Sequence, residues 1–473
     1  MISTVKSQTA PVSAAAHYNT SYIWAVSSSA ALGGLLFGYD WVVIGGAKPF
    51  YEKFFHLSQP SLQGWAMSCA LVGCLIGALV SGELSDHYGR KRLLMLAALV
   101  FGVSSVGTGM AGTLSHFVIW RILGGFAIGL ASSLSPMYIA EIAPAEQRGK
   151  LVSVNQLAIV VGILLAQVVN WLIAKPVPVN ATFDQILFSW NGQVGWRWMF
   201  GVTAIPSLLF FVATLLVPES PRWLVQKGAS EKARGILFRV GGDAYAGRVL
   251  DEIVATTRAE AAGATVATLF EPRMSKVLLL GIVLAVLQQW CGINVIFNYA
   301  EEVFSAAGYE VSSILFNIVI TGVVNLVFTF VALFSVDKFG RRVLMLTGAG
   351  GLAVIYTILG ALYRIHSRGP HMLLLVVAAI ACYAMSLAPV TWVIISEIFP
   401  NKIRGTAMSV AVTSLWVACF ILTYTFPLLN NALGAAGTFW IYAVICLAGL
   451  IFLSVRLPET KGKSLEEIEE SWN

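Results

Sequence analysis

Charged residues are scarce in this chain of 473 residues. It has 30 Lys and Arg and 24 Asp and Glu, so that only 11% of its residues carry charge, while 57% are hydrophobic. A soluble domain usually has about 25% charged residues. So small a charged fraction, with so much hydrophobic sequence, excludes a disordered chain and almost any soluble enzyme. Most of this chain must be surrounded by lipid.

Cysteine and histidine are rare as well. The six cysteines all fall inside apolar runs, which indicates packed free thiols and not a disulfide framework or metal ligands. The six histidines lie in the N-terminal tail, in predicted loops or at the ends of apolar runs, so no catalytic constellation with a nucleophile and a base emerges. We therefore expect no enzyme, no metal site and no cofactor.

Long apolar runs, by contrast, are abundant. A helix needs about 20 apolar residues to cross about 30 Å of hydrocarbon. Runs of this kind lie near residues 22–45, 62–84, 93–112, 117–138, 151–174, 198–217, 275–299, 311–335, 343–363, 372–396, 405–430 and 437–456. They do not alternate between polar and apolar residues, as the strands of a transmembrane barrel would. The sequence predicts an all-α membrane protein with twelve transmembrane helices.

The positive charges are distributed unevenly between the loops. When the loops are numbered alternately, one set carries roughly fourfold more Lys and Arg than the other, and the positive-inside rule puts that set in the cytoplasm. Both termini are then cytoplasmic, and the expected location is the cell (inner) membrane. Because topology explains the net charge of +6, we expect no nucleic-acid partner.

One polar segment divides the apolar runs into six and six. It is rich in Arg, Glu, Ala and Gly, and it contains stretches typical of short surface helices. The predicted domains are a cytoplasmic tail at 1–21, a six-helix bundle at 22–217, a cytoplasmic helical linker at 218–274, a second six-helix bundle at 275–456 and a cytoplasmic tail at 457–473.

Three charged motifs occur in both halves, in the same order and at offsets of about 240 to 256 residues. The residues of these motifs are Asp86, Arg90, Glu141, Arg148, Glu219 and Arg222 in the first half and Asp337, Arg341, Glu397, Arg404 and Glu459 in the second. Arginines of this kind could simply anchor helix ends by the positive-inside rule, but two copies in register favour a further role. We expect the acids and arginines to pair across the cytoplasmic surface and to separate when two bundles rock apart, around a site at the middle of the membrane.

These motifs resemble the major facilitator superfamily. Pro-Glu-Ser-Pro-Arg at 218–222 and Gln-Gln-x-x-Gly-Ile-Asn at 288–294 resemble the sugar porters of that superfamily, and the resemblance runs from about residue 22 to 469. Three segments, 33–40, 134–141 and 392–400, are most similar to the proton-coupled xylose symporters, with the glucose facilitators as a more distant branch. The resemblance implies a monosaccharide carrier that works by alternating access.

A sugar site needs side chains that donate and accept hydrogen bonds, and an aromatic plate for the apolar face of the ring. Amides both donate and accept. Gln288, Gln289 and Asn294 stand on either side of Gly292, which can loosen the helix and let them converge. The other two amides, Gln156 and Asn325, could equally form hydrogen bonds that hold helices together. Including aromatic residues at positions that match the family, the predicted substrate-binding residues are Phe37, Gln156, Gln288, Gln289, Asn294, Asn325, Trp392 and Trp416.

The chain also departs from the pattern of the xylose symporters. Leu415 stands where the family offers an amide, Asn298 stands where it has a tyrosine, and Ala388 replaces a glycine. A missing partner for a buried hydroxyl costs about 1–3 kcal/mol. We therefore expect a different pentose or hexose as substrate, or weaker binding.

Asp40 is the only acid well inside a predicted span, and Arg121 is the only base at a comparable depth. A charge in the membrane costs about 3 kcal/mol or more unless it is neutralised or paired, so the two should meet. In the resembled symporters these positions form the proton-coupling pair, which implies sugar–proton symport. A static ion pair in a facilitator, and a sugar sensor that does not transport, remain the alternatives. The expected partners are a sugar, a proton and the lipid bilayer, and we expect a functional monomer.

Overall fold

The computed structural model of the chain describes residues 18–178, 181–260, 272–399 and 404–459. Every secondary-structure element in these ranges is a helix. Helices suit a lipid environment because they satisfy all backbone hydrogen bonds within one segment. The predicted all-α class is confirmed.

The first half of the chain forms six spans. Five are single helices, namely α1 (Thr20–Phe54), α2 (Pro60–Tyr88), α3 (Arg90–Gly109), α4 (Leu114–Ile142) and α5 (Arg148–Ile173). The short helix α6 (Phe183–Leu187) follows, and the sixth span is built from η1 (Asn191–Gly195), α7 (Trp196–Gly201) and α8 (Ala204–Leu216).

The second half forms six more, of which two are broken. The seventh span consists of α11 (Pro272–Trp290) and α12 (Ile293–Asn298), and the short helix α13 (Ala300–Ala306) follows it. The eighth and ninth are α14 (Val311–Phe339) and α15 (Arg341–Arg364), and the tenth consists of α16 (Pro370–Met385) and α17 (Leu387–Ile398). The last two lie within α18 (Arg404–Arg456).

The length of α18 shows why it holds two spans. Its apolar part covers 51 residues, which as one straight helix would be about 75 Å long, more than twice the hydrocarbon thickness. Gly434 interrupts it with non-helical backbone angles, φ 67° and ψ 175°. The interruption falls between the two predicted runs 405–430 and 437–456, and the described residues therefore contain twelve spans.

The first helix is longer than the apolar run at 22–45 predicted. It continues to Phe54 and contains Pro49. The extension is possible because its charged residues are neutralised: Lys48 Nζ lies 3.0 Å from a carboxylate oxygen of Glu52, one helical turn further on. The hydrophobic run therefore ends before the helix does.

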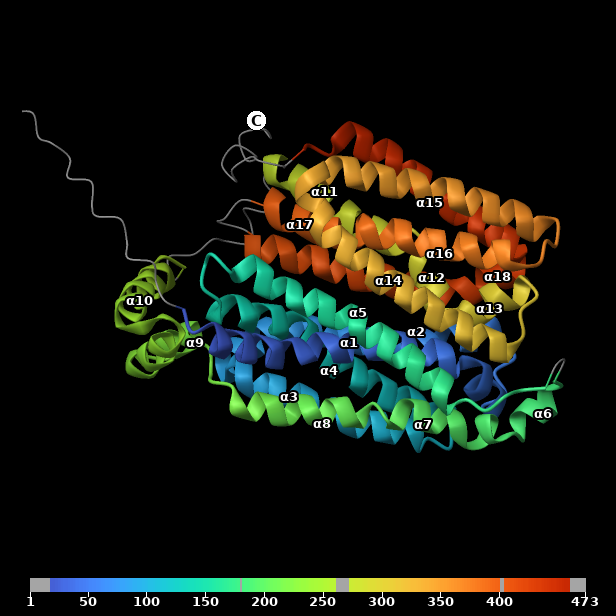
Figure 1. The fold of residues 1–473 in the computed structure, drawn as a ribbon, viewed down its shortest axis with the longest axis horizontal. Coiled ribbons are helices and arrows are strands. Elements are labelled where there is room, and N and C mark those ends of the chain that lie inside the picture. The colour runs from blue at the N-terminus through green and yellow to red at the C-terminus, as the bar shows by residue number, and fades with distance from the viewer. Residues whose placement is uncertain (1–17, 179–180, 261–271, 400–403, 460–473) are drawn as a thin grey trace, which may run out of the picture.

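The segment between the two halves carries α9 (Pro221–Gln226) and α10 (Ser230–Glu260), and α10 is bent at Gly241 and Gly242. Figure 1 shows both at one end of the array of long helices, whereas α6 and α13 lie at the opposite end. We call these the linker end and the far end. The N-terminus of α1 is tied to the linker end because Asn19 N donates to Val240 O at 2.9 Å. The predicted domain boundaries stay a prediction.

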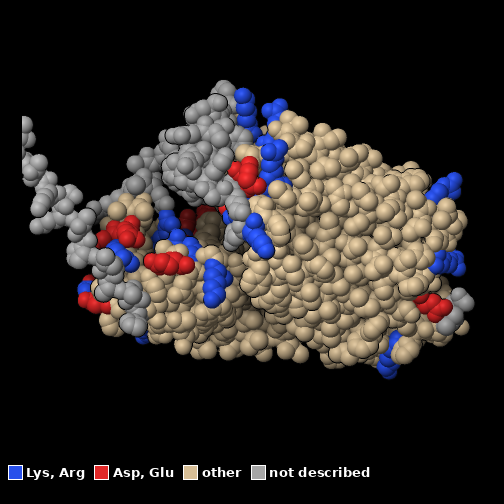
Figure 2. Space-filling model, turned by 45° about the horizontal axis from the view of Figure 1, so that its top comes forward, with Lys and Arg blue, Asp and Glu red and all other residues tan. Residues whose placement is uncertain are grey.

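Charged side chains gather at the two ends of the molecule. Figure 2 shows Lys, Arg, Asp and Glu at both ends of the long axis, and a broad uncharged belt between them on the face in view. Large apolar side chains are exposed on the spans, for example Leu216 and Phe334 at 83% and 80%. Such exposure is what a surface in contact with lipid requires.

Several close contacts join the two halves, and they lie toward the far end. A Cβ atom on Gly64 of α2 would come within 2.3 Å of the Tyr424 carbonyl oxygen of α18, so only glycine permits this approach. The ring centroids of Trp171, near the end of α5, and Phe316, near the start of α14, are 5.8 Å apart. The far end is the closed side of this structure.

Candidate functional site

Three predicted amides form one buried cluster at the break in the seventh span. Gly292 adopts a left-handed conformation, φ 83°, between α11 and α12. Because the helix restarts there, Asn294 Nδ2 donates to Gln289 Oε1 at 2.5 Å, and Gln289 Nε2 donates to Gln288 Oε1 at 3.4 Å. All three residues are at most 6% exposed. The predicted convergence of these side chains is therefore present.

The cluster is also connected to the break in the tenth span. Gln288 Nε2 donates to the carbonyl oxygen of Ala388 at 3.2 Å. Ala388 lies at the start of α17, just beyond Ser386, where the backbone leaves the helix. Two interrupted helices thus present amide and carbonyl groups at the same level, an arrangement found at the substrate sites of transporters.

An aromatic cluster joins the two halves nearby. The ring of Trp416 in α18 lies 5.8 Å from the ring of Phe37 and 6.4 Å from that of Trp41, both in α1. Trp41 is absent from the residues predicted from the sequence. It could have been found, because it stands one helical turn after Phe37 and directly after Asp40.

The three remaining predicted substrate residues lie on other helices. Asn325 is buried in α14, while Gln156 in α5 and Trp392 in α17 are half-buried. Within the described ranges, no hydrogen bond joins these side chains to the amide cluster. The structure thus brings five of the eight predicted residues into two contacting groups, and the other three form no hydrogen bond with the amide cluster within the described ranges.

Asp40 and Arg121 are in direct contact. Arg121 Nη1 of α4 donates to Asp40 Oδ1 of α1, and both residues are buried, at 4% and 6% exposure. The guanidinium also lies over the Phe200 ring, 5.4 Å from its centroid. A charged pair in this position is strongly held, since a buried charge without a partner is costly.

A small cavity of about 20 Å³ adjoins this pair. Its walls include Asp40 and Arg121 from the first half and Asn298 and Thr423 from the second. Arg121 Nε and Asn298 Oδ1 are buried with no hydrogen-bond partner among the described residues. A space of this size can hold about one water molecule where polar groups such as these line part of its wall. Asn298, which replaces the tyrosine of the resembled pattern, therefore lines the same cavity as Asp40.

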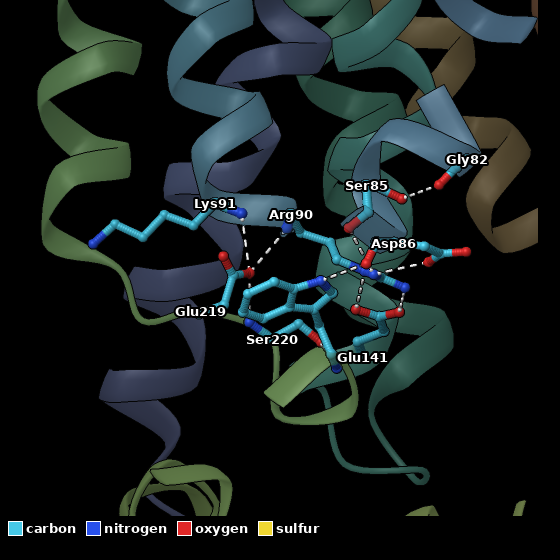
Figure 3. A network of polar contacts seen from close by, with 9 residues as sticks. Gly82, Ser85, Asp86, Arg90, Lys91, Glu141, Glu219 and Ser220 are labelled. Carbon is cyan, nitrogen blue, oxygen red and sulfur yellow. Dashed lines mark hydrogen bonds and ion pairs between the residues drawn. The ribbon is translucent and has the colours of Figure 1, made fainter. Parts of the chain in front are cut away.

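The first copy of the charged motifs forms a network at the linker end, shown in Figure 3. Arg90 binds Glu141 through two hydrogen bonds, Nε to Oε2 at 3.1 Å and Nη2 to Oε1 at 3.0 Å, and a third bond reaches Asp86 Oδ1 at 3.0 Å. Glu219 Oε1 accepts from the backbone N–H groups of Arg90 and Lys91. This carboxylate caps the positive N-terminus of α3.

The second copy repeats the arrangement. Glu459 accepts from the backbone N–H groups of Arg341 and Arg342 at the start of α15, at 3.0 and 3.1 Å. Arg341 Nη2 lies 3.4 Å from Glu397 Oε1. Before each arginine stands a glycine with positive φ, 97° at Gly89 and 89° at Gly340. The internal repeat is thus visible in the structure as well as in the sequence.

The expected pairing of acids with arginines is present at the linker end, and the bonds described above join helices of the same half. The acids that bind Arg90 come from α2 and α4. Pairing that separates when the two bundles rock apart stays a prediction. Arg148 is exposed at the start of α5 and Arg222 lies in α9. The side chains of Asp337 and Arg404 lie outside the described residues.

Comparisons with known proteins agree with this architecture. A family profile described as "Sugar (and other) transporter" matches residues 26–472. The chain is 40% identical to the D-xylose-proton symporter of Escherichia coli (strain K12) over 486 residues, which covers 96% of both chains. It is 37% identical to the arabinose-proton symporter of Bacillus subtilis (strain 168) over 456 residues, again with 96% of both covered.

Solved structures of the xylose transporter XylE from E. coli share the fold. The partially occluded inward-open form has a TM-score of 0.83 at 38% identity and covers 94% of this chain and 100% of that one. XylE bound to 6-bromo-6-deoxy-D-glucose has a TM-score of 0.79 at 40% identity, with 96% and 100% covered. These proteins are transporters and not enzymes, as the sequence predicts. The chain belongs to the sugar transporter family and has the twelve-helix major facilitator fold.

Proposed function

We propose that the chain is a secondary active transporter that carries a pentose or hexose together with a proton by alternating access. Support comes from the relatives reported above, which are named as proton symporters of D-xylose and arabinose. The observation that carries the proposal is the position of the Asp40–Arg121 pair. Phe37 and Trp41 line the cavity beside this pair and also pack against Trp416.

The sugar is proposed to bind between the amide cluster and the aromatic cluster. Gln288, Gln289 and Asn294 would exchange their mutual hydrogen bonds for bonds to sugar hydroxyls, and Trp416 would pack on the ring. The proposed site also includes Gln156, Asn325 and Trp392, which have no bonds to the cluster to give up. These three would complete the site once a ligand lies between the helices.

Asp40 is proposed to carry the proton. When Asp40 takes up a proton, its charge is lost and its attraction for Arg121 falls. Arg121 can then turn toward other acceptors, and the two bundles can close around the sugar without burying an unbalanced charge. Loss of the proton on the other side restores the pair and resets the transporter.

The orientation in the membrane is also part of the proposal. We assign the linker end to the cytoplasm, because the arginines of both motif copies gather there. Both termini are then cytoplasmic, and the protein is placed in the inner membrane as a functional monomer in the lipid bilayer. The far end, where the two halves are in contact, is then the extracellular side.

Uptake into proteoliposomes tests the proposal. A panel of radiolabelled pentoses and hexoses is offered with and without an inward proton gradient. We expect at least one sugar to accumulate above its external concentration only with the gradient. Uptake that merely equilibrates, whatever the gradient, would identify a facilitator, and no uptake of any sugar would contradict the proposal altogether.

A further inference from the structure

A buried lysine lies near the far end of α1, outside the proposed sugar and proton sites. Lys48 is 2% exposed, and its Nζ atom contacts three carboxylates. The distances are 3.0 Å to Glu52, 3.5 Å to Glu301 and 2.5 Å to Glu302. Nζ also lies 5.8 Å from the centroid of the Tyr299 ring. We call Lys48, Glu52, Glu301 and Glu302 the far-end ion cluster.

This cluster joins the two halves of the chain. Lys48 and Glu52 belong to α1, whereas Glu301 and Glu302 lie in the first turn of α13. The backbones also approach closely one turn below, where a Cβ atom on Gly45 would come within 2.8 Å of the Phe297 carbonyl oxygen. Any movement that separates α1 from α12 and α13 must therefore break the bonds of Lys48 to Glu301 and Glu302.

The charges in the cluster do not balance. One ammonium group faces three carboxylates, and two of the carboxylate oxygens, Glu52 Oε1 and Glu302 Oε2, are buried with no hydrogen-bond partner among the described residues. A buried carboxylate with such an oxygen is costly in its charged form, and the uptake of a proton removes this cost. Burial raises the pKa of Glu302, which lies beyond the membrane span, to about 7, although the charge of Lys48 acts in the opposite direction.

The other titratable groups around the cluster do not supply the missing positive charge. Tyr51 and Tyr299 face it from α1 and from the start of α13, and a phenol side chain brings no positive charge. Lys53, next to Glu52 in α1, is half-buried and donates to the Pro49 carbonyl oxygen at 3.1 Å. A proton on one of the acids reduces the imbalance, because it changes the net charge of the cluster from −2 to −1.

We propose that Lys48 is the residue that holds the far end closed, and that the far-end ion cluster takes up a proton when it forms. The inference rests on the alternating-access part of the proposed function but not on the identity of the sugar. When the far end opens, Glu302 becomes solvated and releases this proton. Closure and proton binding at this site then depend on one another.

The sign of the pH dependence follows from this difference. Glu302 holds its proton more tightly in the closed form than in the open form, where the pKa returns to an ordinary value near 4.5. The bound proton therefore stabilises the closed form most at low pH, and this stabilisation is lost as the pH rises toward 7. The ratio of open to closed molecules should rise more than about tenfold between pH 5 and 7.

Distance measurements between spin labels can test this. Ser58, after α1, and Ala306, in α13, are exposed at the far end in different halves. They are replaced by cysteine in a chain whose six native cysteines have been removed, and the labelled protein is studied in nanodiscs without sugar from pH 5 to 8. In the parent chain we expect a short distance at pH 5 and a growing share of a longer distance toward pH 7.

Four substitutions give the decisive comparison. Lys48→Met should raise the share of the longer distance at every pH, and Lys48→Arg should restore the parent behaviour. Glu302→Gln, which imitates the protonated acid, should stay closed and lose the pH dependence. Lys53→Met removes a lysine from the same helix outside the cluster and should behave like the parent chain.

Several results would overturn the inference. These are a Lys48→Met distance distribution equal to that of the parent chain, a parent chain without pH dependence, or a Glu302→Gln variant that keeps it. If Asp40→Asn abolished the pH dependence while Glu302→Gln did not, the effect would belong to Asp40. Sugar uptake is measured separately, so a failure of proton-coupled transport leaves this test unaffected.

Discussion

At the scale of single residues, the interior of this protein is organised by buried polar side chains. An amide or a charge inside the membrane is stable only if another group satisfies it. Asp40 has Arg121, Lys48 has three acids, and the amides of α11 and α12 have one another. Each of these arrangements can be disturbed by one substitution, with an effect that depends on which partner is left behind.

Asn294→Ala should weaken sugar binding. The substitution removes a proposed donor to the sugar and leaves Gln289 Oε1 without its bond from Asn294. The cost of such a loss is about 1–3 kcal/mol, which corresponds to a dissociation constant about 5 to 150 times higher. Isothermal titration calorimetry with the transported sugar measures it.

Asn191→Ala is the matched control for this prediction. Asn191 is equally buried but bonds only to the backbone of Lys175, at 2.8 and 2.7 Å. Its loss should lower stability and leave the dissociation constant of the sugar unchanged. If Asn294→Ala bound sugar as tightly as the parent chain, the amide cluster would not be part of the site.

Some of these buried polar and aromatic residues are easier to predict from the sequence than others. Asp40, Arg121 and the amides stand out because polar residues are rare in apolar runs. Trp41 and Lys48 are harder to find, since a tryptophan or a lysine near the end of a helix is commonplace. Their surroundings come from α18 and α13, more than 250 residues away along the chain.

At the scale of helices, the interruptions matter more than the regular parts. The seventh span breaks at Gly292 and the tenth at Ser386, and the hydrogen bond from Gln288 to Ala388 connects the two. The sequence predicts the first break, because a glycine stands there between polar residues. Pro389 indicates the second break less strongly. Proline has no backbone N–H to donate to the Met385 carbonyl, and its ring clashes with that carbonyl in a regular helix.

Gly292→Ala should damage both stability and binding. The residue has φ 83°, and an added Cβ would lie 2.8 Å from the Tyr442 ring. A non-glycine residue in this conformation costs about 1–2 kcal/mol before the clash is counted. We expect a lower melting temperature in detergent and weaker sugar binding, because the helix can no longer restart in the same place.

Gly235→Ala is the corresponding control. Gly235 lies inside α10, and an added Cβ would meet nothing within 4 Å. Alanine is about 1 kcal/mol better than glycine within a helix, so this variant should be as stable as the parent chain or slightly more stable. A Gly292→Ala variant that matched it in stability and in sugar affinity would show that the break is unimportant.

At the scale of the whole molecule, two similar halves are each held together by their own charged network at the linker end. The repeat was predictable from the spacing of the motifs. The sequence does not predict which helices the charged pairs connect, because spacing along the chain does not reveal which helices are neighbours. The networks connect helices within each half, whereas the close backbone approaches between the halves, at Gly45 and Gly64, lie toward the far end.

Arg90→Ala should therefore destabilise the first half and not merely loosen the contact between halves. Arg90 is 4% exposed, and its removal leaves Glu141 and Asp86 without their cation. Breaking a buried pair in this way costs about 3–5 kcal/mol. Thermal unfolding in detergent should show a clearly lower melting temperature.

Arg92→Ala removes an exposed arginine from the same helix end and should change the stability by less than about 0.5 kcal/mol. The comparison separates the network from the general effect of a positive charge at the membrane surface. Equal melting temperatures for the two variants would mean that the network does not hold the half together.

In the proposed mechanism, sugar and proton move together, and Asp40 couples them. Adding the transported sugar to lightly buffered proteoliposomes and following the external pH measures this coupling. We predict that the medium becomes more alkaline with the parent chain, and that Asp40→Asn abolishes this while sugar exchange between two loaded sides continues. An equal pH change with Asp40→Asn, or none with the parent chain during sugar uptake, would contradict the account.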